Sequence, residues 1–281
     1  MNFPPLIINL APTGAMATAD KNPHLPLTEE AIIADVLAGA RLGASMAHLH
    51  VRDAAGQPSS DHERFRQVIE GIRATPEGRE LTVCASTSGR HGQTLEQRAA
   101  ALDLTGIAKP DMASLTLGSL NFVNDVSVNS PDAIRFLASK MRDRGIKPEL
   151  EVFDLGMLHF AKALIAEGLI QPPYYFNLLL GNIAGAQADF SDISALVQQL
   201  PPNAVWGLAG IGKSQKHAMG IGCVMAPAVR TGLEDNLWQD THPRLPASNA
   251  GLVNWLVELA RAYGRPLAAP AEVRRLLGIA R

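Results

Sequence analysis

The segment Ser45–Asp53 carries two histidines, His48 and His50, that are separated by one residue. The apolar residues between and before them predict a β-strand, in which alternate side chains lie on the same face, so that His48, His50 and Arg52 are expected to share one face. Two imidazoles on one face can bind a single metal ion. With a carboxylate or histidine from elsewhere, such a pair typically holds zinc and leaves one coordination position open. The alternative is two ordinary histidines at a strand end.

Glu234 is the best candidate for the third ligand, because it follows an apolar strand and Gly232. The alternative for Glu234 and its neighbour Asp235 is an exposed turn or the acidic start of a helix, where the helix dipole favours negative charge.

Further polar residues stand at the ends of other apolar segments. Glu151 lies within an apolar strand, and its alternative interpretation is a structural carboxylate paired with Arg230 or Arg52, since buried carboxylates are rarely unpaired. The segment Ser86–Gly89 is either a plain loop or a source of hydroxyl and backbone N–H groups for an anion. The other polar residues at strand ends are Ser114, Thr116 and Glu149.

The elements that must position these residues alternate along the chain. Eight apolar segments, each continuous as in buried parallel strands, are associated with helical segments, which indicates parallel βαβ units. Eight such units favour a TIM (β/α)8 barrel, whose active site lies at the carboxyl ends of the strands. The predicted strands are Leu6–Leu10, the histidine segment, Leu81–Ala85, Met112–Leu117, Pro148–Phe153, Tyr174–Leu180, Ala204–Leu208 and the segment from Val229.

The helix boundaries carry capping signals, such as Ser130 followed by Pro131. The last long helix is predicted over Ser248–Tyr263, and a short terminal helix over Pro270–Gly278. We find no repeat or linker, so the sequence predicts one TIM-barrel domain over residues 1–281 with a C-terminal helical extension.

Composition excludes several classes of protein. The 281 residues include 25 Lys and Arg and 27 Asp and Glu, so the net charge of −2 gives no basic footprint for nucleic acid. Two cysteines do not form a disulfide framework and fit a reducing compartment. The N-terminus lacks the features of a signal peptide, and no apolar run reaches the roughly 20 residues that span a bilayer. We therefore expect a cytoplasmic protein without a membrane partner.

Several stretches, taken in order, resemble the β-keto acid cleavage enzymes, the family typified by 3-keto-5-aminohexanoate cleavage enzyme. The similarity runs from the first strand to the terminal helix. The matching stretches are residues 11–15 (APTGA), 48–53 (HLHVRD), 112–115 (MASL), 118–122 (GSLNF), 148–154 (PELEVFD), 209–212 (AGIG) and 232–236 (GLEDN).

The resemblance implies a TIM barrel that binds one Zn²⁺ through His48, His50 and Glu234. It also implies a reaction of a β-keto acid with acetyl-CoA that gives acetoacetate and a new acyl-CoA. It marks Asp235 as the general base and places Glu151 in the same catalytic group.

Further implications of the resemblance concern the remaining site residues and the assembly. Arg230 belongs to the catalytic group, and Ser86, Ser114 and Thr116 match substrate-binding positions, although the typical member has threonine and asparagine at the last two. The resemblance also implies a homo-oligomer, a tetramer in the family. The chemistry agrees, because a metal bound to a β-keto acid polarises the ketone and acidifies the C–H group beside it.

Two positions depart from the family pattern, and both are expected near the mouth of the barrel. Met16 stands where the typical member has a glutamate that holds the substrate's ammonium group. The segment Gly181–Gly185 reads Gly-Asn-Ile-Ala-Gly, where the family commonly has Val-Pro-Gly-Gly. A thioether cannot stabilise a cation as a carboxylate does, so the substrate is expected to lack a distal cation and to carry an uncharged or apolar distal group.

Two other classes of protein can combine this fold with a metal site. A metal-dependent hydrolase of the amidohydrolase type can use the same fold, but such sites add histidines at later strand ends, where this chain has Glu151, Glu234 and Asp235. A barrel that binds a metal or ligand without catalysis would not need Arg230, Asp235 and Glu151 together. Formation of acetoacetate from a β-keto acid and acetyl-CoA would distinguish the three classes.

Overall fold

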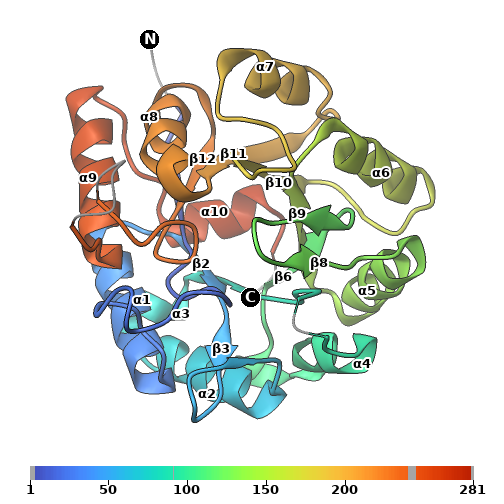
Figure 1. The fold of residues 1–281 in the computed structure, drawn as a ribbon, viewed down its shortest axis with the longest axis horizontal. Coiled ribbons are helices and arrows are strands. Elements are labelled where there is room, and N and C mark those ends of the chain that lie inside the picture. Colours follow the sequence, from blue (N-terminus) through green and yellow to red (C-terminus); the bar gives the residue numbers. More distant parts are fainter. Residues whose placement is uncertain (1–3, 91, 240–244, 280–281) are drawn as a thin grey trace.

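Eight parallel strands close into a barrel in the order β1-β12-β11-β10-β9-β6-β5-β2, with helices around it (Figure 1). This closed barrel of parallel strands confirms the predicted TIM barrel. The computed structural model describes residues 4–90, 92–239 and 245–279. The barrel strands are β1 (Ile7–Leu10), β2 (Met46–Leu49), β5 (Thr82–Ala85), β6 (Met112–Thr116), β9 (Lys147–Val152), β10 (Tyr174–Leu180), β11 (Ala204–Gly210) and β12 (Ala228–Thr231).

Most of the α-helices begin where a side chain can accept a hydrogen bond from a free N–H group of the first turn. Thr28 caps α1, Ser130 caps α5 and Ser248 caps α9 in this way. The α-helices are α1 (Glu29–Leu42), α2 (His62–Arg73), α3 (Pro76–Arg79), α4 (Leu95–Arg98), α5 (Pro131–Arg144), α6 (Leu155–Ala166), α7 (Phe190–Gln198), α8 (Gln215–Met225), α9 (Asn249–Ala262) and α10 (Pro270–Leu276).

The strand that carries the histidines is shorter than the sequence predicts. It ends at Leu49, and β3 (Val51–Arg52) pairs instead with β4 (Pro58–Ser59) in a separate antiparallel ribbon. The expectation that Arg52 shares a strand face with the two histidines is therefore wrong. The guanidinium of Arg52 instead donates hydrogen bonds to the carbonyls of Gly14 and Ala17, which fixes the loop after β1.

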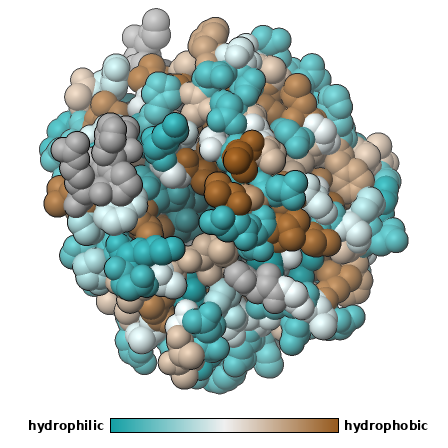
Figure 2. Space-filling model, viewed as in Figure 1, coloured by the Kyte–Doolittle hydropathy of each residue, from teal (hydrophilic) through white to brown (hydrophobic). Residues whose placement is uncertain are grey.

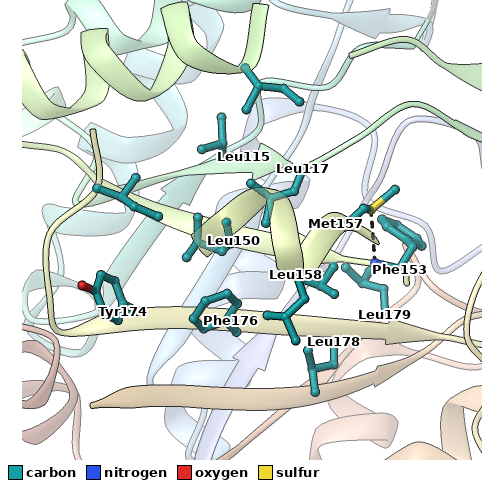
Figure 3. Packing of buried hydrophobic residues seen from close by; sticks show 14 of the residues in the cluster. Leu115, Leu117, Leu150, Phe153, Met157, Leu158, Tyr174, Phe176, Leu178 and Leu179 are labelled. Carbon is teal, nitrogen blue, oxygen red and sulfur yellow. Dashed lines mark hydrogen bonds between the residues drawn. The ribbon is translucent and has the colours of Figure 1, made fainter. Parts of the chain in front are cut away.

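The space between the strands and the outer helices is filled by apolar side chains. Figure 3 shows Leu150 of β9 and Phe176 of β10 next to Leu158 of α6, and all three are buried. Since both faces of each barrel strand are covered, the strands read as continuous apolar runs. This packing holds the strand ends, and hence the polar side chains on them, in fixed positions.

The C-terminal helix α10 contributes to a second cluster, which lies inside the barrel. Val273 and Leu277 pack there with Met46, Cys84 and Tyr175. Val273 lies in α10 and Leu277 directly follows it, whereas the other three residues lie in β2, β5 and β10. The C-terminal helix therefore covers one end of the barrel. The opposite end, where the strands finish, remains accessible to a substrate.

The surface view of one face shows hydrophobic residues interspersed with hydrophilic ones (Figure 2). Among the described helices, none combines the length and apolar character that crossing a membrane requires.

Candidate active site

The carboxyl ends of neighbouring strands bring the two histidines and Glu234 together. His48 lies in β2, His50 directly follows it, and Glu234 follows β12; β1 lies between these two strands. Oε1 of Glu234 lies 3.4 Å from Nε2 of His50 and 3.8 Å from Nε2 of His48. The sequence-predicted ligand set is therefore assembled in one place.

Two glycines allow this close approach of the loops. A Cβ atom on Gly14 would lie 2.6 Å from Cγ of Glu234, and one on Gly232 would lie 2.0 Å from the carbonyl oxygen of Ala11. Both glycines have positive φ angles, +62° and +151°, which side chains disfavour. The loops after β1 and β12 can therefore pack against each other only with glycine at these positions.

The geometry of His48, His50 and Glu234 fits a metal ion. Ligands at zinc distances in a tetrahedral site lie roughly 3.3–3.6 Å from one another, close to the 3.4 and 3.8 Å measured here. Oε2 of Glu234 is buried and has no hydrogen-bond partner within the described residues. Two imidazoles and a carboxylate suit zinc, although cobalt, nickel or manganese can occupy such a donor set.

A second group of potential ligands, His48, Cys84 and Glu149, is better explained by hydrogen bonding. Nδ1 of His48 lies 2.5 Å from Oε2 of Glu149, which is too short for two ligands of one tetrahedral ion. The thiol of Cys84 donates to the same oxygen over 3.1 Å. His48 therefore contacts Glu149 with one nitrogen and directs the other towards Glu234.

Glu149 belongs to the candidate site through its contact with His48, although the sequence alone assigned it no role. Its carboxylate is fully buried in β9 and accepts hydrogen bonds from Asn9 (2.7 Å) and Asn177 (3.3 Å). A carboxylate on the second nitrogen of a metal-binding histidine fixes the ring and its tautomer. The signal was available, since Glu149 and Glu151 alternate along one strand and so share a face.

The charges of this pair shift both pKa values. Burial raises the pKa of Glu149, but His48 opposes this effect and the pKa falls to about 2. Burial lowers the pKa of His48, whereas Glu149 and Glu234 raise it, to about 9 overall. Without a metal, this environment therefore holds a proton on the imidazole that a metal ion would displace.

Arg230 joins the metal-site carboxylate to the predicted catalytic group. Its guanidinium is buried and makes two bonds of 2.9 Å to Asp235 and one of 2.7 Å to Glu234. Nη1 of Arg230 lies 3.8 Å from Glu151, which also accepts a 2.6 Å hydrogen bond from Thr116. Arg230, Asp235 and Glu151 therefore form one cluster, as predicted.

Burial makes both carboxyl groups of this cluster more basic than their free counterparts. The pKa of Asp235 is raised by burial, against the opposing effect of Arg230. The pKa of Glu151 is raised for the same reason, again opposed by nearby positive charge. A proton acceptor with a raised pKa is a more effective general base.

A cavity of about 500 Å³ opens onto these groups. Its lining includes all four residues predicted to bind substrate: Met16, Ser86, Ser114 and Thr116. The lining also includes residues that the sequence analysis did not single out, among them Arg90 and Phe122.

The hydroxyl groups of the predicted substrate residues also organise the wall. Oγ of Ser114 accepts a 2.9 Å hydrogen bond from the backbone N–H of Thr87, and Oγ of Ser86 accepts one of 3.3 Å from Ser88. A larger hollow, of about 930 Å³, is lined by Arg73, Lys147 and other residues, and none of the predicted site residues reaches it.

Comparison with known proteins identifies the family of the chain. The family model for beta-keto acid cleavage enzyme matches residues 5–279. The chain belongs to the β-keto acid cleavage enzyme family. The amidohydrolase alternative is not supported, because this match covers almost the whole chain and, in the part that the structure describes, β6, β9, β10, β11 and β12 contain no histidine.

The curated relatives agree with the family assignment over their full length. The chain is 37% identical to a 3-keto-5-aminohexanoate cleavage enzyme from Fusobacterium nucleatum, with 98% of each chain covered. It is 38% identical to a 3-oxoadipate:acetyl-CoA acetyltransferase from Cupriavidus necator, covering 98% of this chain and 95% of that one.

Among solved structures, the fold is similar to apo ObcA, with a TM-score of 0.77 and 19% identity. The match covers 92% of this chain and 66% of ObcA. At this identity the likeness concerns the fold, and it again supports the barrel.

Replacement of His48 by alanine is expected to remove the metal and leave a folded barrel, because it deletes one of three ligands. Elemental analysis of the purified wild-type protein should show about one zinc equivalent per chain, and the variant should show little. Circular dichroism checks that the variant is folded. Full metal retention by the variant would refute the ligand assignment.

The change Glu149→Gln is expected to weaken zinc binding by about 10- to 100-fold, because the histidine loses the carboxylate that orients it. Competition with a chromogenic chelator measures the affinity. Glu70→Gln, on the outer helix α2, serves as the control and should bind zinc as the wild type does. Equal affinities in all three proteins would show that Glu149 has no part in orienting His48.

Proposed function

We propose that this chain is a zinc-dependent enzyme that condenses a β-keto acid with acetyl-CoA and cleaves the product to acetoacetate and a new acyl-CoA. The observation that carries the proposal is the contact of Arg230 with both Glu234, a metal-ligand candidate, and Asp235, the base candidate. The names of the relatives, which include acetyl-CoA transferases, support the reaction class.

His48, His50 and Glu234 would hold the zinc ion, which supplies Lewis-acid polarisation of the keto acid. Asp235 takes a proton from the carbon between the keto and carboxylate groups, and Arg230 keeps Asp235 oriented for this transfer. Ser86 and Ser114 line the cavity where the acid would bind. Thr116 holds Glu151 through its 2.6 Å hydrogen bond.

The proton that Asp235 removes is returned to the product at the end of the reaction. Carbon–carbon bond formation at the acetyl carbonyl releases the CoA thiolate, which then adds to the original ketone. Cleavage of the adjacent carbon–carbon bond gives acyl-CoA and the acetoacetate carbanion, and protonated Asp235 returns its proton to that carbanion. Asp235 therefore ends each cycle in the state in which it began.

The loops around the cavity determine which substrate side chain the enzyme accepts. Met16 lines the cavity with 45% of its surface exposed, and it offers no charge to a cationic group. We therefore assign to the substrate a distal group that carries no positive charge. A single domain over residues 1–281 and a cytoplasmic homotetramer belong to the same proposal and rest on the cysteine content and family resemblance.

The change Asp235→Asn preserves size and removes basicity, so turnover should fall by roughly 10²- to 10⁴-fold. The assay follows CoA-dependent formation of acetoacetate from acetyl-CoA and a panel of β-keto acids. Zinc content and thermal midpoint, measured on the same preparations, test whether the variant stays intact. Near-normal turnover would transfer the role of base to Glu151, and hydrolysis without CoA in the wild type would contradict the proposed reaction.

The wild-type enzyme is expected to use β-keto acids without a distal cation more efficiently than 3-keto-5-aminohexanoate or 3-dehydrocarnitine. The reason is that a buried cation without a partner costs several kcal/mol, on the order of the penalty known for unpaired ions. Met16→Glu should shift the ratio of kcat/KM values towards the amino substrate. Steady-state kinetics of both proteins test this, and a wild-type preference for either cationic substrate would show that another residue carries the compensating charge.

A further inference from the structure

Arg90 occupies an unusual position in the wall of the active-site cavity. Its guanidinium carbon lies 3.3 Å from the centre of the Phe122 ring. Phe122 is itself packed edge-on against Phe153, with ring centres 5.9 Å apart. Phe153 directly follows β9, the strand that carries Glu151, so the stack is anchored to the barrel. The arginine is thus held beside the cavity in a defined orientation.

Among the residues that the structure describes, the guanidinium of Arg90 has no partner of opposite charge. Within residues 4–90, 92–239 and 245–279, no carboxylate oxygen lies within 4.0 Å of it and it donates no hydrogen bond. The backbone N–H of Arg90, in contrast, donates to Ser88. A guanidinium stacked on an aromatic ring keeps its in-plane N–H groups free, and these match the two oxygens of a carboxylate.

The remaining charges of the cavity favour an anion. Apart from the candidate metal ligands and the cluster around Arg230, its lining includes three cationic residues, Lys21, Arg90 and Lys213, and the carboxylate of Asp125. Asp125 is close enough to act on Arg90 electrostatically, but it is outside ion-pair distance. At the entrance, Met16 and Ile183 are apolar. A negative group on the bound substrate would therefore be stabilised here.

The position of Arg90 fits the keto acid better than the phosphates of CoA. Arg90 lines the same cavity as Glu151 and Glu234, and the Phe122 ring on which it stacks packs against Phe153, two residues after Glu151. The phosphates of CoA are separated from the thioester by the whole pantetheine arm. A group on the keto acid a few bonds from the ketone would remain near the reacting centre.

We propose that Arg90, stacked on Phe122, binds a second carboxylate at the distal end of the substrate, so that the preferred substrates are 3-oxo dicarboxylic acids. This inference rests on the proposed function and narrows it. It agrees with the absence of a carboxylate at Met16, since a substrate with an anionic end needs no acidic partner there.

The test compares 3-oxoadipate with 3-oxohexanoate, which has the same chain length and a methyl group in place of the distal carboxylate. The wild type should prefer the diacid. In Arg90→Met, kcat/KM for the diacid should fall by about 10- to 100-fold, the range for a lost hydrogen bond to a charged group, whereas kcat/KM for the monoacid should change little. Arg90→Lys should recover part of the loss because it restores the charge without the planar fork.

Arg135→Met is the matched control, because Arg135 also lies over a phenylalanine, Phe160, at 5.3 Å. It belongs to the outer helix α5 and pairs with Glu167, away from the cavity. Its kinetics with both acids should equal those of the wild type. Equal losses for both acids in Arg90→Met, or a wild-type preference for the monoacid, would overturn the inference. A raised KM for acetyl-CoA with both acids would assign Arg90 to CoA instead.

Calorimetric titration of each acid into the zinc-loaded protein, without acetyl-CoA, separates this inference from the proposed reaction. Tighter binding of the diacid, lost in Arg90→Met, supports the carboxylate site even if no acetoacetate forms, in which case only the proposed reaction fails. Equal binding of the two acids overturns the carboxylate site, whatever the turnover.

Discussion

Arg230 is buried at the carboxyl ends of the strands, and carboxylates from two parts of the chain surround it. Asp235 makes a two-point contact with it, Glu234 makes a third bond, and Glu151 lies 3.8 Å away. An unpaired guanidinium at this depth would carry a large desolvation penalty, and each acid would be costly without it. The positions of these three acids therefore depend on one cation, which links the candidate metal ligand Glu234 to the candidate base Asp235.

A second buried charge pair supports the opposite side of the same site. Glu149 holds His48, and the amides of Asn9 and Asn177 hold Glu149. These residues lie on β1, β2, β9 and β10, so the network reaches across the interior of the barrel. Removing one member would take a hydrogen-bond partner from the buried polar groups that remain, which is costly in a buried network. The orientation of His48 is thus a property of the whole barrel.

The candidate site divides into residues held by buried ion pairs and residues on loops at the mouth of the cavity. The candidate metal ligands and catalytic residues are held by buried ion pairs with Glu149 and Arg230. Met16, Arg90 and Ile183, in contrast, lie on loops at the mouth, where a substitution changes the lining and leaves those ion pairs intact. Relatives whose names include 3-keto-5-aminohexanoate, 3-oxoadipate and 3-dehydrocarnitine each match at least 97% of this chain.

The barrel and most of the site were predictable from the sequence alone. Continuous apolar runs alternating with capped helices determine the parallel barrel, because only strands covered on both faces read in this way. His48, His50 and Glu234 were identifiable because their spacing and neighbours place them at strand ends. Their roles as ligands, and those of Asp235 and Glu151 in catalysis, stay predictions. The motifs of the family placed Arg230, Asp235 and Glu151 in one catalytic group, but only the structure shows that Arg230 pairs with Asp235.

Tertiary structure decided what depends on contacts between distant segments. Local pattern extended one strand to Arg52, but the chain leaves the barrel after Leu49, and Arg52 instead fixes the loop that contains Gly14. Glu149 meets His48 across 101 positions of sequence, so no local pattern shows their contact. The stacking of Arg90 on Phe122 likewise joins two loops. Periodicity reports which face of an element is buried, whereas the partner of a buried charge is set only when the barrel closes.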